Sequence, residues 1–303
     1  MIFRSILFTS FIVFCTQPLF SQNEPNKLYF VITKDGNEHI GNLEGETDLD
    51  VTLRLRNQEI VVIQKTNIRL FEPVTEDNFL KGKYVAPNPF ANRYLTGSSS
   101  IPPGKNRFLV NTTYALAYTL DYGINDVYSL GLSTTLVGVP VLLNGQANYK
   151  VGNQLYFGAT ATGGWLSWAD PAIFFGYGGV RLTSGSRNNN YTIGGGFFSV
   201  DINPGRNNTF IGNVSLGDFG YINFSAMKRY TKKLSGHAEV WVLKNLYLKR
   251  SVYMINVGSK IQRRERSAWS FFVSTLAFYE FRTNDLQVIP IPCIAWCRNF
   301  GKK

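Results

Sequence analysis

The stretch LYFGATATG, residues 155–163, alternates strictly between two kinds of side chain. Its odd positions are apolar or small, whereas its even positions hold Tyr, Gly, Thr and Thr. Successive side chains of a β-strand point to opposite faces, so this period of two predicts a strand with one apolar and one polar face. Residues 209–216 and 253–258 repeat the pattern.

Working outward from this stretch, about twelve such segments follow one another after residue 106. They begin near residues 106, 126, 140, 153, 171, 190, 208, 220, 235, 252, 268 and 287. Each is about 8–14 residues long, close to the roughly 9–11 that a tilted strand needs to cross the hydrocarbon core of a bilayer. Because strands in lipid satisfy their backbone groups only in a closed sheet, residues 106–300 are predicted to form an antiparallel up-and-down transmembrane β-barrel of about twelve strands.

The composition agrees with an all-β membrane protein. Charged residues make up 17% of the chain and aromatic residues 15%, against about 25% charged residues in typical soluble proteins. After the N-terminus no apolar run approaches the roughly 20 residues of a spanning helix. A soluble exported β-barrel that binds a small ligand would show the same alternation and is kept as an alternative, but low charge and high aromatic content favour the membrane.

The N-terminus has the organisation of a secretory signal peptide. A basic residue, Arg4, precedes an apolar stretch over residues 6–15, and Pro18 and Ser21 follow before Gln22. This pattern predicts a signal peptide over residues 1–21 and export of the mature chain.

Two cysteines, Cys293 and Cys297, remain after cleavage. Four residues along a strand span about 13 Å, whereas a disulfide needs Cα atoms about 4.4–6.8 Å apart. If the segment is extended, the two cannot pair with each other. We therefore expect small buried hydrophobic side chains rather than a disulfide or a metal site.

Residues 27–74 contain five short strand-like runs, with a strong turn signal at Lys34-Asp35-Gly36-Asn37. The pattern of a strand, an Asp-Gly turn, "IGNL" and later "EIVVIQKTNIRLF" resembles Sm-like or SH3-like small barrels. The resemblance implies a small five-stranded β-barrel-like domain that binds or assembles, and is not a catalyst.

Residues 75–105 are predicted to be a linker. Four prolines and a Gly-Ser cluster oppose both helix and central strand. The segment NPFANRYL, residues 88–95, is aromatic for a free linker. We expect it to pack on the barrel.

The alternation over residues 106–300, together with the aromatic end "CIAWCRNF" at residues 293–300, resembles outer-membrane β-barrel proteins of Gram-negative bacteria. The resemblance implies the cell outer membrane, with the N-terminal module in the periplasm, where it could have a protein partner. Two features depart from the pattern. Phe300 is followed by three more residues, and Pro290 and Pro292 remove two N–H donors that point to one edge of the last segment. Either the last strand starts after Pro292, or the barrel seam is open there.

The formal net charge is +11, and much of it lies between residues 228 and 266. In an exported β protein, the phosphates of outer-membrane lipid, including lipopolysaccharide, are better partners for this charge than nucleic acid. Solvated turns would also explain it. The candidate contacts with anionic lipid are Lys232, Lys233, Lys249, Arg250, Arg263, Arg264 and Arg266.

Ser235, His237 and Glu239 alternate along one predicted strand and share a face. Hydroxyl, imidazole and carboxylate are the groups of nucleophilic hydrolysis. Side chains two residues apart on one strand are about 6.6 Å apart at their bases, however, which suits a catalytic triad poorly. We interpret the three residues as polar lining of the lumen and predict that the protein is not an enzyme. The sequence indicates no cofactor and no metal site.

Connections of no more than roughly eight residues disfavour a large ligand-gated receptor. The predicted role is structural or binding, with a narrow or plugged lumen. A narrow transport pore that prefers anions and a lipid-acting enzyme that uses His237 are the alternatives.

Overall fold

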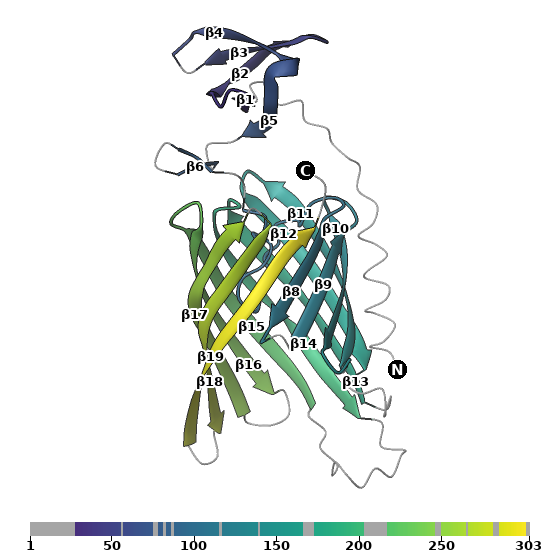
Figure 1. Ribbon diagram of the computed structural model, residues 1–303. Helices are drawn as coiled ribbons and strands as arrows, with labels where there is room; N and C mark the ends of the chain where they lie inside the picture. The colour runs from purple at the N-terminus through teal and green to yellow at the C-terminus, as the bar shows by residue number, and fades with distance from the viewer. Residues whose placement is uncertain are drawn as a thin grey trace. The chain divides into compact units, whose positions relative to one another are not determined.

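The computed structural model describes residues 28–300 except 56, 75–77, 81–82, 86–87, 115–116, 139, 166–172, 203–216, 246–249, 265 and 281–284. The chain divides into two compact units, Met1–Glu76 and Asp77–Lys303 (Figure 1). No helix in the described part is long and apolar enough to cross a membrane.

The first unit contains a five-stranded antiparallel sheet. Its elements are β1 (Leu28–Thr33), β2 (Glu38–Glu46), β3 (Asp50–Leu55), β4 (Ile60–Gln64), the 3-10 helix η1 (Lys65–Asn67) and β5 (Ile68–Val74). The strand order is β4-β3-β2-β1-β5, so β4 and β5 form the two edges of the sheet. Its buried core consists of Val31, Val51, Leu53 and Ile63.

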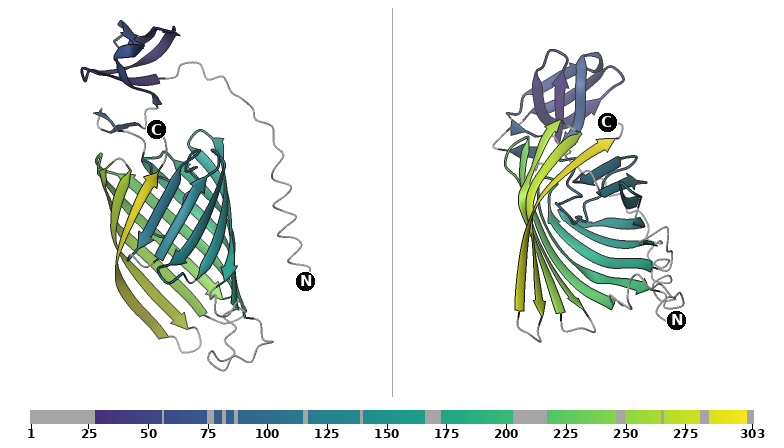
Figure 2. Two further views of the ribbon diagram at one scale, coloured as in Figure 1. Left: turned by 45° about the vertical axis from the view of Figure 1, so that its right-hand side comes forward. Right: turned by 60° about the horizontal axis from the view of Figure 1, so that its bottom comes forward.

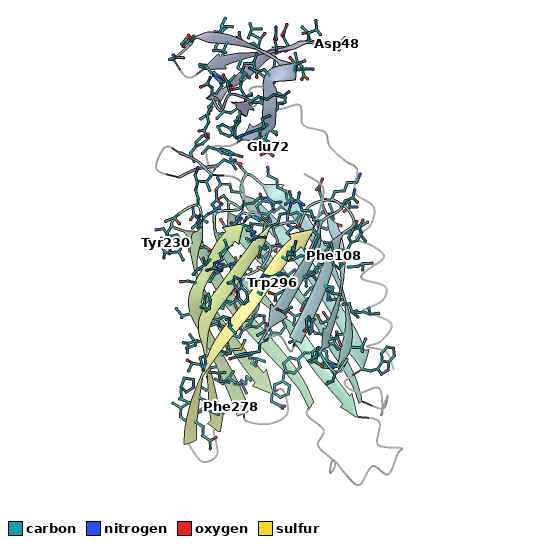
Figure 3. All side chains as sticks on the ribbon, in the orientation of Figure 1. Asp48, Glu72, Phe108, Tyr230, Phe278 and Trp296 are labelled. Atoms are coloured by element: carbon teal, nitrogen blue, oxygen red, sulfur yellow. The ribbon has the colours of Figure 1, made fainter. Side chains whose placement is uncertain are left out.

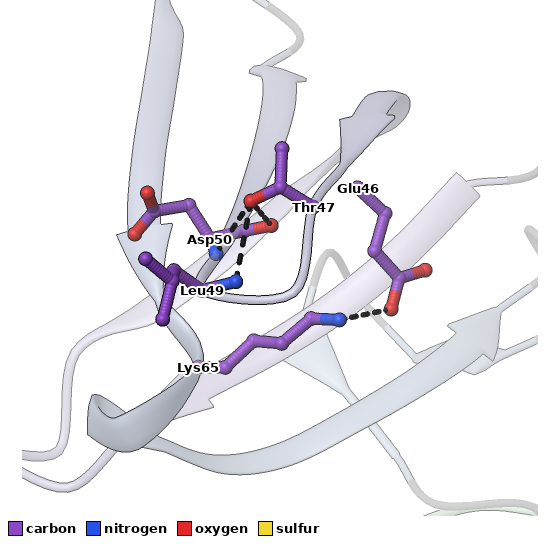
Figure 4. A network of polar contacts seen from close by, with 5 residues as sticks. All are labelled: Glu46, Thr47, Leu49, Asp50 and Lys65. Atoms are coloured by element: carbon purple, nitrogen blue, oxygen red, sulfur yellow. Dashed lines mark hydrogen bonds and ion pairs between the residues drawn. The ribbon is translucent and has the colours of Figure 1, made fainter.

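The turn between β2 and β3 is fixed by polar contacts (Figure 4). The Thr47 hydroxyl accepts hydrogen bonds from the backbone N–H groups of Leu49, at 3.3 Å, and Asp50, at 2.9 Å. Lys65 of η1 forms an ion pair with Glu46 of β2, with 2.7 Å between Nζ and Oε1. These contacts join the turn to the end of β4.

The second unit begins with a small hairpin of β6 (Phe79–Leu80) and β7 (Lys83–Tyr84) and continues as a closed antiparallel barrel of twelve strands. The barrel strands are β8 (Phe108–Thr113), β9 (Ala117–Gly123), β10 (Tyr128–Thr135), β11 (Val141–Gly152), β12 (Leu155–Trp165), β13 (Ile173–Gly185), β14 (Asn189–Ile202), β15 (Gly217–Arg229), β16 (Leu234–Asn245), β17 (Arg250–Arg264), β18 (Ser267–Glu280) and β19 (Asp285–Phe300). Neighbours in sequence pair with each other, and β19 returns to β8. The predicted fold class is confirmed.

Strand starts agree with the sequence pattern to within three residues, with two exceptions. The strand expected near residue 208 lies outside the described residues, and β9 was not predicted at all. Residues 108–123 alternate without a Gly, Pro or Asn-Gly signal at the turn. The turn residue is instead Tyr114, which takes a left-handed φ of 56°. A tyrosine in that region is uncommon, so no turn chemistry marks the hairpin in the sequence.

The barrel is apolar outside and polar inside. Outward side chains such as Val180, Phe224 and Phe271 are 52%, 51% and 47% exposed. The neighbouring inward side chains Asn223 and Ser270 are 2% and 4% exposed. A belt of exposed apolar side chains around a whole barrel suits lipid rather than water. The barrel is therefore a transmembrane barrel.

Both ends of the barrel chain, Phe108 and Phe300, lie at one end of the cylinder because β8 and β19 are antiparallel partners. We call this the terminal end. It also carries the short β9–β10, β11–β12, β13–β14, β15–β16 and β17–β18 connections. In Figure 3, Tyr230 lies at the terminal end, and Phe278 lies toward the opposite end.

The seam between β19 and β8 is closed over only part of its height. β19 is paired with β18 from Asp285 to Arg298, but with β8 only from Ala295 to Phe300. One further bond, from Tyr114 N–H to the Ile294 carbonyl at 2.9 Å, ends this ladder. Figures 1 and 2 show β17 to β19 extending beyond β8 and β9.

The two prolines explain how the seam ends. Pro290 and Pro292 lie in phase with Ile294, whose carbonyl points toward β8. Alternate residues of a strand direct their backbone groups to the same edge, so the missing N–H groups fall on the edge that no described strand covers. Of the two alternatives, the open seam is correct: β19 starts before the prolines. Prolines on such an edge also prevent pairing with another chain.

Candidate functional site

Residues 88–103, which we call the plug, lie among the inward side chains of the barrel. Phe90 packs with Leu109, Ala268 and Cys297 from three strands, and all four side chains are buried. A second cluster joins Ala91, Tyr94 and Ile101 of the plug to Met227, and a third joins Leu95 to Phe272 and Ala295. The sequence predicted only that this aromatic segment packs on the barrel. Its apolar side chains in fact pack inside the lumen, against inward side chains of the wall.

Glu239 of β16 holds the middle of the plug. Its carboxylate accepts hydrogen bonds from the backbone N–H groups of Leu95 (2.5 Å), Thr96 (3.1 Å) and Gly97 (3.2 Å), and from the Thr96 hydroxyl. Asn256 donates to the same carboxylate at 3.3 Å. Three consecutive amides that converge on one carboxylate form an anion-binding turn, here filled by a side chain of the wall. The Glu239 side chain is 1% exposed.

Lys260 of β17 provides the complementary contact. Its ammonium donates to the carbonyls of Arg93, at 2.9 Å, and Tyr94, at 3.2 Å. The wall thus presents a carboxylate to backbone donors and an ammonium to backbone acceptors of the same turn. Tyr94 adds hydroxyl contacts at 2.6 Å to Asn190 and Thr192.

The C-terminal half of the plug is bound by the opposite wall. The Ser100 N–H donates to the Thr183 hydroxyl at 2.8 Å, and Arg187 donates to the Pro102 carbonyl at 3.0 Å. Gly158 of β12 makes room for this segment, because a Cβ there would lie 2.7 Å from the Ser100 hydroxyl. The plug therefore contacts both sides of the lumen.

The structure places Ser235, His237 and Glu239 on the inward face, with 6%, 4% and 1% exposure. The Ser235 hydroxyl lies 2.9 Å from His237 Nε2. The Glu239 carboxylate binds the plug instead of the imidazole, whose Nδ1 has no hydrogen-bond partner in the described residues. The arrangement lacks the carboxylate that orients the base of a hydrolytic triad.

A pocket of about 210 Å³ lies between the plug and the wall of β9 to β16. Its most unusual side chain is Arg181 of β13, which is 6% exposed. One guanidinium nitrogen donates to Gln146 at 3.2 Å, and Nε has no partner in the described residues. The lining contains no carboxylate. A second lining arginine, Arg93, is instead paired with Asp121. Sequence reasoning missed Arg181, whose only signal is a charge at an inward position of an aromatic strand.

The basic candidates separate into two groups. Lys232, Lys233, Arg263, Arg264 and Arg266 all lie at the terminal end and are exposed. By contrast, Arg250 begins β17 at the opposite end, and Lys249 lies outside the described residues. The three arginines share an outer groove of about 710 Å³ with Arg298, which sequence reasoning missed.

Cys293 and Cys297 are both free thiols. Within the described part of the chain, no group of His, Cys, Asp and Glu side chains is arranged to hold a metal ion.

No protein-family model matches the chain, and no curated protein matches it in sequence. Among solved structures, outer-membrane OmpT of Vibrio cholerae is similar over 91% of this chain and 95% of its own, at 10% identity and a TM-score of 0.38. An anion-selective porin from Comamonas acidovorans is similar over 91% and 97%, at 9% identity and 0.32. The CymD monoaromatic hydrocarbon channel is similar over 65% and 87%, at 10% identity and 0.34. The likeness is one of β-barrel architecture.

Proposed function

We propose that this protein is a plugged outer-membrane barrel that holds the module of residues 28–74 in the periplasm and passes no solute at rest. The observation that carries the proposal is the double contact of Glu239 and Lys260 with the plug backbone. Bacterial barrels with an even number of strands have both chain ends on the periplasmic side. This rule supports a periplasmic position for the terminal end and for the module that precedes it.

The plug is suited to a permanent closure. Its apolar side chains fill the lumen beside β8 and β18, and its polar groups are bound on both walls. Releasing it would remove the plug amides from the Glu239 carboxylate and the plug carbonyls from the Lys260 ammonium, and losing hydrogen bonds to charged groups is costly. A structural or binding role follows, since transport would require that contact to break.

Single-channel recording in planar bilayers tests the closure. We expect no conductance steps from the full-length protein, and stable steps from a variant in which residues 90–101 are replaced by a Gly-Ser segment of equal length. Steady conductance of the natural protein would overturn the proposal. Silence of the replaced variant would show that something other than the plug closes the lumen, and would contradict the role given to it.

A second candidate function, binding of a small anion in the lumen, is favoured by Arg181. The Arg181 guanidinium lines a polar pocket whose lining contains no carboxylate, and its Nε has no hydrogen-bond partner in the described residues. Arginine matches the planar geometry of carboxylate and phosphate oxygens. The alternative of an anion-preferring pore would use the same residue, but only after the plug moves.

Replacing Arg181 by Gln should weaken binding of inorganic phosphate or acetate by about tenfold or more, because hydrogen bonds to a charged group contribute about 1.5–3 kcal/mol. Isothermal titration of the detergent-solubilised protein measures this. Arg187→Gln is the matched control, since Arg187 binds the plug carbonyl of Pro102 and does not line the pocket. Equal affinity of the Arg181→Gln variant and the natural protein would remove this function.

A further inference from the structure

The outer face of the barrel carries a basic groove at the terminal end. It has a volume of about 710 Å³ and lies over the ends of β17, β18 and β19. The lining residues are Arg263, Arg264, Arg266, Ser267, Trp269, Trp296 and Arg298. None of the four arginines forms an ion pair with a described residue, and the lining contains no carboxylate. The groove therefore has four positive charges available to a ligand.

A β-bulge creates this concentration of charge. The register between β17 and β18 shifts between Gln262 and Arg264. In a regular strand, Arg263 and Arg264 would point to opposite faces. Both are exposed here, because a bulge redirects one side chain of the strand. The bulge thus brings a second arginine to the face that already carries Arg298.

The aromatic floor of the groove is held in place. Trp269 of β18 and Trp296 of β19 are direct cross-strand partners. The Trp296 indole N–H donates to the Ser267 hydroxyl at 3.1 Å. The Arg298 guanidinium lies 4.7 Å from the centre of the Phe300 ring, which restricts its position next to the tryptophans. Tryptophan side chains of membrane proteins concentrate at the level of the lipid headgroups.

We infer that this groove binds the phosphodiester headgroup of an anionic phospholipid. Arginine binds phosphate oxygens in a bidentate manner, and the two indole rings lie where the glycerol and the upper acyl chains of a bilayer lipid would be. The apolar belt of the barrel continues from Trp269 to Phe271 and Val273 along β18. A lipid could therefore keep its chains on the belt and its phosphate among the arginines.

The choice of phospholipid over lipopolysaccharide rests on the proposed function, which places the terminal end in the periplasm. The inner leaflet of the outer membrane consists of phospholipid. The groove gathers Arg263, Arg264 and Arg266 of the sequence candidates, but not Lys232 or Lys233. Of the remaining candidates, Arg250 begins β17 at the opposite end, and Lys249 lies outside the described residues.

Native mass spectrometry of full-length protein, exchanged into mixed micelles with phosphatidylglycerol, cardiolipin and phosphatidylcholine, tests the inference. The natural protein should retain the two anionic lipids at least tenfold more than phosphatidylcholine. The quadruple variant R263Q/R264Q/R266Q/R298Q should lose this preference. The matched control K150Q/K228Q/K232Q/K233Q removes four exposed charges near the same end and should keep it.

Three outcomes would overturn the inference. If both quadruple variants lost the preference for anionic lipid equally, the attraction would be an unspecific effect of charge. If the groove retained free glycerol phosphate tightly, it would be an anion site that does not require a lipid. Retention of lipopolysaccharide in preference to phospholipid, through the same arginines, would contradict the phospholipid assignment. Labelling of a cysteine introduced at Asp48 in intact cells reports separately on which side of the outer membrane the module of residues 28–74 lies. Failure of the lipid site and failure of the periplasmic placement are thereby distinguished.

Discussion

Replacing Glu239 by Ala is expected to release the plug and open the barrel. The substitution removes the acceptor of three consecutive backbone N–H groups and leaves them buried without a partner. Each buried donor left without an acceptor costs about 1–3 kcal/mol, so losing the acceptor of three N–H groups is large compared with the roughly 5–15 kcal/mol by which a folded protein is stable. The barrel wall has its own ladder of backbone hydrogen bonds, so we expect the plug to detach while the barrel stays folded.

Two measurements check this expectation. Conductance steps should appear in planar bilayers, as for the variant without the natural plug. A cysteine at position 91, where Ala91 is 1% exposed, should react with a polar maleimide only when Glu239 is replaced. Both tests use a background with Cys293 and Cys297 changed to Ser.

Ser235→Ala is the control for the plug experiment. Ser235 lies on the same inward row of β16 and is 6% exposed, but its hydroxyl contacts His237 and not the plug. This variant should stay closed and unlabelled. If Glu239→Ala also stays closed, the apolar contacts of Phe90 and Leu95 are sufficient to hold the plug, and the carboxylate is not its principal anchor.

The sequence predicts the strands of the barrel wall better than the position of the plug inside the lumen. Alternation along a strand states which residues share a face, and it therefore places Ser235, His237 and Glu239 together. It does not state which distant segment covers that face. Glu239 and Leu95 are 144 residues apart in the chain, and the prolines and glycines of the plug indicate only the absence of regular structure. The burial of the plug depends on the shape of the closed lumen, which no single strand encodes.

Arg298 and the seam show what a single strand can and cannot predict. Arg298 lies in the basic groove because the register of β18 with β19 pairs it with Ser267. Register depends on two segments, so the sequence of β19 alone does not predict this position. Pro290 and Pro292, by contrast, remove N–H donors from their own strand, whatever strand lies beside it. The sequence therefore left two possibilities, a strand that starts after Pro292 or an open seam, and the structure has the open seam. The effect of a proline on its own strand can be predicted from the sequence. Which other segment packs or pairs with that strand is much harder to predict.

An engineered disulfide across the seam is expected to close the barrel covalently. Cys297 is the direct partner of Asn111 in the register of β19 with β8. Because Ile294 and Tyr114 form a hydrogen-bonded pair of this ladder, Cys297 and Asn111 form a non-hydrogen-bonded pair. Cα atoms in such pairs are about 4.5 Å apart, within the 4.4–6.8 Å that a disulfide allows. Asn111→Cys should therefore oxidise with the natural Cys297 and join the two ends of the barrel.

The chain-entropy model gives about 5 kcal/mol of stabilisation for a loop of this length. In the Cys293→Ser background, oxidised Asn111→Cys protein should migrate faster than reduced protein on a denaturing gel after boiling, because the loop remains closed. Thr113→Cys is the matched control, since it lies on the same face of β8 but opposite Ala295. It should form no intramolecular bond. A disulfide from position 113 but not from 111 would show that the register of the seam differs by two residues from the one described here. If neither position formed a disulfide, β8 and β19 would not meet, and the barrel would have an open side along its full height.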